Sequence, residues 1–125
     1  MLYTEKVMDA FQNPKNVGDM ENYDGMGQTG SEACGDIMQV FIKVENDRIV
    51  DAKFKTFGCA AAIASSSTAT ELIKGMTVEE ALQVTNKRVI EILGGLPPQK
   101  VHCSVLAEET IKAAIEDYIQ KRDNK

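Results

Sequence analysis

Residues 37–57, which read IMQVFIKVENDRIVDAKFKTF, determine the fold class of this chain. Alternation of apolar with other side chains is typical of half-buried β-strands, and it runs through residues 37–44 and again through residues 48–57. The alternating positions are Met38, Val40, Ile42 and Val44 in the first segment and Val50, Ala52, Phe54 and Thr56 in the second. Glu45-Asn46-Asp47 lies between them and supplies residues that tolerate left-handed backbone, so the stretch predicts an antiparallel hairpin.

The sequence on both sides of this hairpin predicts mainly helices. Their expected positions are residues 3–11, 59–74, 77–84 and 87–93 and a long C-terminal helix. The C-terminal helix has one apolar stripe, made of Leu106, Ala107, Ile111, Ala114, Ile115 and Tyr118. A further strand is expected within residues 27–34. We therefore expect an α+β fold in one domain spanning residues 1–125, with a small antiparallel sheet of about three strands covered by helices on one side.

Length and charge exclude several classes of function. The chain has 125 residues, with 14 Lys and Arg against 19 Asp and Glu, which gives a formal net charge of −5. A net acidic domain lacks the basic surface of a nucleic-acid binder or of a protein that docks on anionic membranes. The first residues lack the apolar run of a signal peptide, and no stretch is long enough to span a bilayer. We expect a soluble cytoplasmic protein.

The chemistry of the chain centres on Cys34, Cys59 and Cys103, together with its single histidine, His102. An odd number of cysteines does not fit a disulfide framework. All three lie at the ends of expected elements, and Cys59 and Cys103 come at helix N-termini, where the backbone stabilises a thiolate. Asp36 follows Cys34 by two residues, so in extended chain both side chains point to the same side.

These residues allow several interpretations. Thiolates bind zinc, copper(I) and iron–sulfur clusters, but the wide cysteine spacing is unlike that of a zinc finger. The alternative is separate structural roles, with Cys59 as a small packing residue and His102 as a capping or solvent-facing side chain. A structural zinc module also fits the same residues. A hydrolase or transferase with Cys103 as nucleophile is disfavoured, because adjacent side chains on a helix rarely face each other.

Five stretches resemble the IscU/NifU-type iron–sulfur cluster assembly scaffolds. They are residues 3–9 (YTEKVMD), 13–18 (NPKNVG), 33–36 (ACGD), 58–67 (GCAAAIASSS) and 96–107 (LPPQKVHCSVLA). The resemblance covers nearly the whole chain and implies an IscU/SufE-like fold. It also implies a non-enzymatic scaffold, which builds a [2Fe–2S] cluster from iron and sulfur and passes it to apo-acceptor proteins.

The resemblance further implies the ligands and partners. The cluster or its iron would be bound by Cys34, Asp36, Cys59, His102 and Cys103, and zinc is the other metal that these residues would bind in the cluster-free form. Sulfur would arrive as a persulfide from a cysteine desulfurase. An accepting thiol must be accessible and of low pKa, and we expect Cys103 to accept first and Cys34 second. The expected state is a monomer or a cluster-linked homo-oligomer.

Two positions depart from the family pattern. Ala10 stands where the family usually has histidine, so any role of that histidine is absent. Gln99 replaces a typical valine in Leu96-Pro97-Pro98-Gln99-Lys100, the segment read by an Hsp70-type chaperone in chaperone-dependent relatives. That segment therefore has two interpretations, a chaperone-binding motif or an extended, stiff connector that positions His102 and Cys103.

Overall fold

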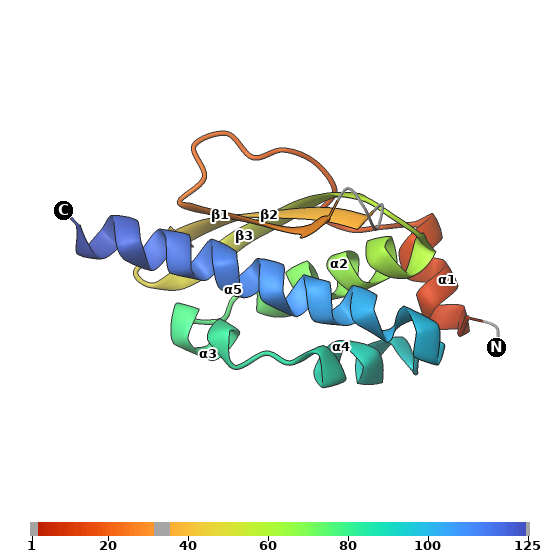
Figure 1. Cartoon of the computed structure of the whole chain (residues 1–125). Coiled ribbons are helices and arrows are strands. Elements are labelled where there is room, and N and C mark those ends of the chain that lie inside the picture. Colours follow the sequence, from red (N-terminus) through yellow and green to blue (C-terminus); the bar gives the residue numbers. More distant parts are fainter. Residues whose placement is uncertain (1–2, 32–35, 125) are drawn as a thin grey trace.

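The structure is a computed structural model that describes residues 3–31 and 36–124, and for Ser31 and Asp36 it describes the main chain only. Its sheet has three antiparallel strands in the order β1-β2-β3 (Figure 1). These are β1 (Gly25–Ser31), β2 (Asp36–Glu45) and β3 (Arg48–Phe57). The hairpin and the third strand expected from the sequence are confirmed, although β1 begins two residues earlier than expected.

The β2–β3 hairpin contains one irregularity that the alternation did not predict. Asn46 and Asp47 both have positive φ, at 53° and 59°, as the turn requires. Beyond the turn, Val44 pairs with Ile49 and Lys43 pairs with Asp51, so Val50 is an extra residue in β3. This bulge turns Val50 outward, where it is 45% exposed, and buries Ile49 completely. The expectation that Val50 belongs to the buried face is therefore wrong.

Besides the sheet, the described part of the chain contains six helical segments. They are α1 (Glu5–Gln12), α2 (Ala60–Ile73), α3 (Val78–Leu82), α4 (Asn86–Leu93), the 3-10 turn η1 (Pro98–Lys100) and α5 (Val101–Asp123). Thr4, Thr77 and Thr85 cap α1, α3 and α4 through their side chains, which explains why these short helices begin where they do. The extended connector expected over residues 96–100 is only partly correct, because its last three residues form the 3-10 turn.

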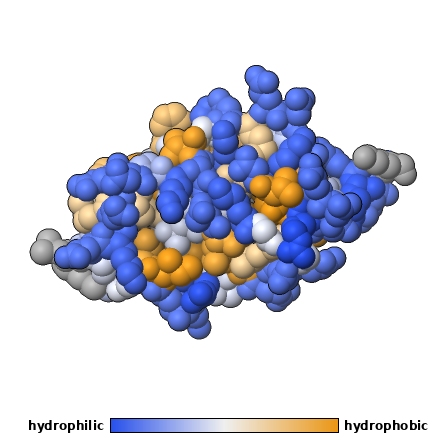
Figure 2. Space-filling view, turned by 180° about the vertical axis from the view of Figure 1, so that it is seen from behind, coloured by the Kyte–Doolittle hydropathy of each residue, from blue (hydrophilic) through white to orange (hydrophobic). Residues whose placement is uncertain are grey.

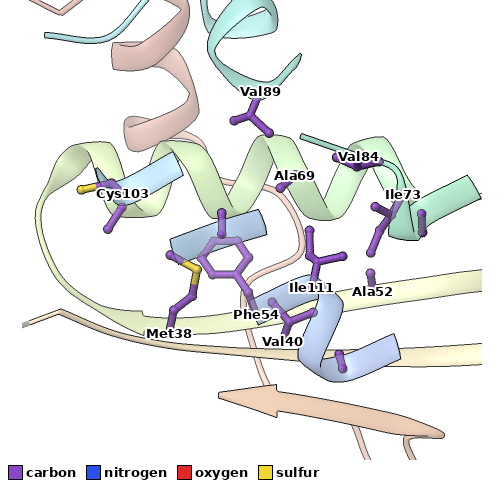
Figure 3. Close-up of a cluster of buried hydrophobic side chains, with 14 of the residues drawn as sticks. Met38, Val40, Ala52, Phe54, Ala69, Ile73, Val84, Val89, Cys103 and Ile111 are labelled. Carbon is purple, nitrogen blue, oxygen red and sulfur yellow. The ribbon is translucent and has the colours of Figure 1, made fainter. Parts of the chain in front are cut away.

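Helices α2 and α5 pack on one face of the sheet, and α3 and α4 lie on their far side (Figure 1). The core fills the space between these layers, with Met38, Val40 and Phe54 from the sheet meeting Ile111 from α5 (Figure 3). Helix α2 lies inside the fold, where it contacts α1, α4, α5 and the sheet. Its many Ala and Ser side chains allow these close approaches.

Strand β1 and helix α5 approach each other so closely that glycine is required between them. A Cβ atom built on Gly27 would lie 2.4 Å from the Thr110 carbonyl oxygen and 2.5 Å from the Ala114 nitrogen. A Cβ on Gly25 would lie 2.3 Å from the Ala114 carbonyl oxygen. The backbone of α5 therefore rests directly on β1.

Ser65 provides a test of how α2 is packed. Its hydroxyl is fully buried and, among the described residues, has no hydrogen-bond partner. Burying an unpaired hydroxyl costs about 1–3 kcal/mol, so we expect Ser65→Ala to raise the free energy of unfolding by about 1 kcal/mol. Urea denaturation followed by circular dichroism measures the change. Ser67→Ala is the matched control and should destabilise the protein, because the Ser67 hydroxyl accepts the Lys15 N–H at 2.9 Å.

Candidate functional site

The ends of two strands and two helices lie together at the end of the molecule opposite the C-terminus. Strand β2 begins there at Asp36, β3 ends there at Phe57, and helices α2 and α5 begin there (Figure 1). The pairing of Ile37 with Phe57 aligns the two strand ends. Phe57 is 74% exposed, so a large aromatic side chain stands in solvent two residues before Cys59.

Two of the predicted site cysteines are in contact. Cys59 is the N-cap residue of α2 and has extended backbone, with φ −80° and ψ 176°. Cys103 is the third residue of α5, and its sulfur lies at one end of the core cluster (Figure 3). The two Sγ atoms are 3.6 Å apart, although 44 residues separate them in sequence. Folding therefore brings together two thiols that the sequence placed only at separate helix starts.

His102 adds an imidazole to this pair. Its Nε2 atom lies 3.6 Å from the Cys103 Sγ atom. The expectation that adjacent side chains of a helix would not meet is wrong for this pair, because the imidazole and the thiol are in contact at this distance. Cys103 is fully buried while His102 is exposed, so a substrate would reach the imidazole far more easily than the thiol. This unequal access disfavours a hydrolase with Cys103 as its nucleophile.

The surroundings of Cys59 favour a thiolate. Burial alone raises the pKa of this thiol, but the N–H groups of Ala62 and Ala61, the Cys103 thiol and the Lys100 ammonium together hold it below its ordinary value. The pKa of Lys100 is raised, and the main cause is the negative charge of the Cys59 thiolate. The start of α2 thus provides a half-buried thiol with a lowered pKa and a lysine ammonium beside it.

Lys100 is the residue of this site that the sequence did not single out. The sequence treats it only as part of the segment leading to His102. The turn η1 ends at Lys100 and α5 begins at the next residue, so the lysine lies close to the start of α2 as well. Its position two residues before His102 and three before Cys103 is the sequence feature that could have identified it as a site residue.

The other predicted site residues lie outside what the structure describes. Cys34 is outside the described residues, and Asp36 is described by its main chain as the first residue of β2. Among the side chains that the structure describes, which exclude that of Asp36, no group of three or more His, Cys, Asp and Glu residues is arranged to hold a metal ion. Of the five predicted residues, the described part of the chain brings together Cys59, His102 and Cys103.

A separate cavity of about 730 Å³ lies between α1, α2 and α4. Its lining combines apolar side chains such as Ala10, Leu72 and Ile92 with charged ones such as Asp9 and Glu71, and it includes none of the predicted site residues.

Apolar areas interrupted by hydrophilic side chains are also visible on the back of the molecule (Figure 2). No helix in the described part of the chain is both long and apolar enough to cross a membrane.

Comparison with known proteins assigns the chain to a family. The chain matches the NifU-like N terminal domain family over residues 2–125. It belongs to this family. Among curated proteins, it is 58% identical over 120 residues to an iron–sulfur cluster assembly scaffold protein IscU of Archaeoglobus fulgidus, a match that covers 96% of this chain and 78% of the relative. It is also 52% identical to the IscU scaffold protein of Escherichia coli, over the full length of both chains.

Solved structures of this family have the same fold. One is described as an iron–sulfur cluster assembly scaffold protein for the SUF system from Fervidobacterium islandicum, with a TM-score of 0.77 and 27% identity over 90% of this chain and 96% of that one. Another is the N-terminal part of a nitrogen-fixing NifU-like protein from Brucella abortus, with a TM-score of 0.75 and 18% identity over 94% of each chain. The expected resemblance and α+β fold are therefore confirmed.

Proposed function

We propose that this protein is a scaffold on which an iron–sulfur cluster is assembled and from which it is transferred to apo-acceptor proteins. The observation that carries the proposal is the contact between the Cys59 and Cys103 sulfur atoms at 3.6 Å, with the His102 imidazole beside them. Soft thiolates are the preferred ligands of iron–sulfur clusters. Membership of a family whose relatives are named scaffold proteins supports the same function. We propose that residues 1–125 act as one module.

The cluster is cargo, and we propose that it is a [2Fe–2S] cluster. Its ligands are drawn from Cys34, Asp36, Cys59, His102 and Cys103. Four cysteine ligands would favour retention of the cluster, whereas this chain has three. A carboxylate or imidazole in the fourth position leaves one iron exchangeable, which suits a protein that must release what it builds. Zinc occupies the same ligands in the cluster-free form.

Sulfur arrives in this proposal as a persulfide on a cysteine desulfurase. An accepting thiol must be accessible and of low pKa. Within the described pair, Cys59 is half-buried with a lowered pKa, whereas Cys103 is fully buried. We therefore replace the expectation that Cys103 accepts sulfur first and assign that role to Cys59. The protein turns over no free substrate, so it is a carrier and not an enzyme.

The remaining partners follow from this function. The protein meets a desulfurase and apo-acceptors, and it acts as a monomer or as a homo-oligomer linked by the cluster. The segment Leu96-Pro97-Pro98-Gln99-Lys100 is the proposed contact for an Hsp70-type chaperone. Pro98 and Gln99 are exposed in η1, so a partner can reach them. Leu96 and Pro97 are buried, so a chaperone that binds the whole segment must first open it.

Anaerobic reconstitution with iron and sulfide, followed by transfer to an apo-ferredoxin, tests the proposed function. We expect a visible chromophore, iron and acid-labile sulfide in equal amounts, and appearance of the acceptor's own spectrum when the two proteins are mixed. Absence of any cluster in a folded protein that retains only zinc would contradict the scaffold function and favour a structural zinc module.

Asp36→Cys tests how the cluster is released. Placing a thiolate two residues after Cys34 completes a set of four cysteines and removes the proposed exchangeable position. We expect the variant to hold its cluster longer against a chelator and to transfer it several-fold more slowly. The comparison is made at equal starting cluster content, with Asp36→Asn as the control that removes the carboxylate without adding a thiol. Equal or faster transfer from Asp36→Cys would shift the release role to His102.

A further inference from the structure

Cys59 and Cys103 form a pair of thiols with unequal access to solvent. Their Sγ atoms are in van der Waals contact at 3.6 Å, yet Cys59 is half-buried and Cys103 is completely buried. A reagent in solution therefore reaches Cys59 first. Any sulfur atom that becomes attached to Cys59 Sγ stands next to a second thiol that solution reagents do not reach.

Sulfur delivered as a persulfide is not yet at the oxidation level that a cluster needs. The outer sulfur of a persulfide is sulfane sulfur, whereas the bridging atoms of an iron–sulfur cluster are sulfide. Two electrons must be supplied before the delivered atom can bridge two irons. A neighbouring thiol is a source of such electrons, because thiolates attack sulfur–sulfur bonds and displace the other sulfur.

We propose that Cys103 resolves a persulfide on Cys59 and releases its outer sulfur as hydrogen sulfide inside the site. This inference rests on the proposed function, because the desulfurase supplies the persulfide. The Cys103 sulfur attacks the Cys59 Sγ atom, and the bond between Cys59 Sγ and the outer sulfur breaks. The outer sulfur leaves with the bonding electron pair and takes the proton of Cys103, which gives hydrogen sulfide and a Cys59–Cys103 disulfide.

The electrons of this step balance without an outside reductant. The two thiol sulfurs lose two electrons in forming the disulfide, and the sulfane sulfur gains them. The contact distance makes the attack a unimolecular step between groups that folding has already placed together. A dithiol reductant then reopens the disulfide and restores both thiols as cluster ligands.

Two features of the fold suit this division of roles. Cys59 precedes the first turn of α2 on extended backbone, so the accepting sulfur sits at an accessible chain end. Cys103 lies within α5 and is fully enclosed, which shields the resolving thiol from persulfides and other thiols in solution. The pair therefore releases sulfide only after sulfur has been loaded on Cys59.

The test uses the full-length apo-protein and one equivalent of cysteine persulfide under anaerobic conditions, followed by rapid desalting. The reaction is run in a Cys34→Ser background, which keeps the pair intact and removes the third thiol as a competing nucleophile. Intact mass, free thiols and released sulfide are measured. We expect about one sulfide per chain, loss of both thiols and no retained sulfur atom.

Matched variants identify the role of each thiol. Cys103→Ala should keep the added sulfur atom on Cys59 and release sulfide at least about tenfold more slowly. Cys59→Ala should neither load nor release sulfur at the rate of the intact pair. A persulfide that survives in the protein with both cysteines, or equally fast sulfide release from Cys103→Ala, would overturn the inference.

This experiment separates the inference from the proposed function. Cluster reconstitution from iron and inorganic sulfide needs no persulfide, and it is measured on the wild-type protein with Cys34 in place. If the wild type reconstitutes normally but the Cys34→Ser background keeps its persulfide, only the resolving role of Cys103 is refuted. If the Cys34→Ser background releases sulfide and forms the disulfide but the wild type never assembles a cluster, the inference is supported and the scaffold function is refuted.

Discussion

Replacing either Cys59 or Cys103 with serine is expected to reduce the iron and acid-labile sulfide retained after reconstitution to less than about a tenth of the wild-type amount. The two sulfur atoms lie 3.6 Å apart, so one cluster would use both as ligands. A serine hydroxyl is a harder and far less acidic donor than a thiol, and it does not replace a thiolate on iron. We expect the same loss for Cys34→Ser if all three cysteines serve one site.

The fold should survive these substitutions, because serine is close in size to cysteine. Circular dichroism and thermal unfolding of the apo-variants provide that check. Ala60→Ser is the matched control, since it adds a hydroxyl next to Cys59 while leaving every thiol in place. Wild-type cluster content in a Cys59→Ser or Cys103→Ser variant would show that the two thiols do not share a cluster.

Gly27→Ala is expected to lower the free energy of unfolding by about 3 kcal/mol, which corresponds to a fall in Tm of about 10 °C for a domain of this size. The added Cβ would lie 2.4 Å from the Thr110 oxygen, 2.5 Å from the Ala114 nitrogen and 2.8 Å from the Ala113 Cβ. Two of these atoms belong to the backbone of α5, so the helix itself must move. Because α5 also carries His102 and Cys103, the same substitution should weaken cluster binding.

Gly18→Ala is the control for this prediction. Nothing lies within 4 Å of a Cβ at Gly18, and the cost there is the strain of a side chain at φ 137°. Strain of this kind costs on the order of 1–3 kcal/mol, but it does not displace α5. Urea unfolding gives the stability change, and the cluster content at low temperature shows whether α5 has moved. If Gly27→Ala retains wild-type stability, the close contact between β1 and α5 is refuted.

The hairpin shows how much of the fold local sequence patterns can predict. Alternation and turn residues predicted both strands of residues 37–57 and the turn between them, because these features act between near neighbours along the chain. The bulge at Val50 was missed, since an extra residue in one strand is visible only when its partner is known. Likewise β1 was weakly defined, because Gly25 and Gly27 carry no alternation signal and are required by contact with α5.

Sequence patterns were sufficient to predict the α+β class, the long amphipathic C-terminal helix and the residues that resemble a cluster scaffold. Periodicity, capping residues and motifs are local, so they can be read without coordinates. The packed fold was needed to show that Cys59 and Cys103 touch, that His102 contacts its neighbouring thiol and that Cys103 is buried while Cys59 is accessible. Distance between residues 44 positions apart, and the solvent access of each, depend on how α2 and α5 pack, and no segment of the chain carries that information alone.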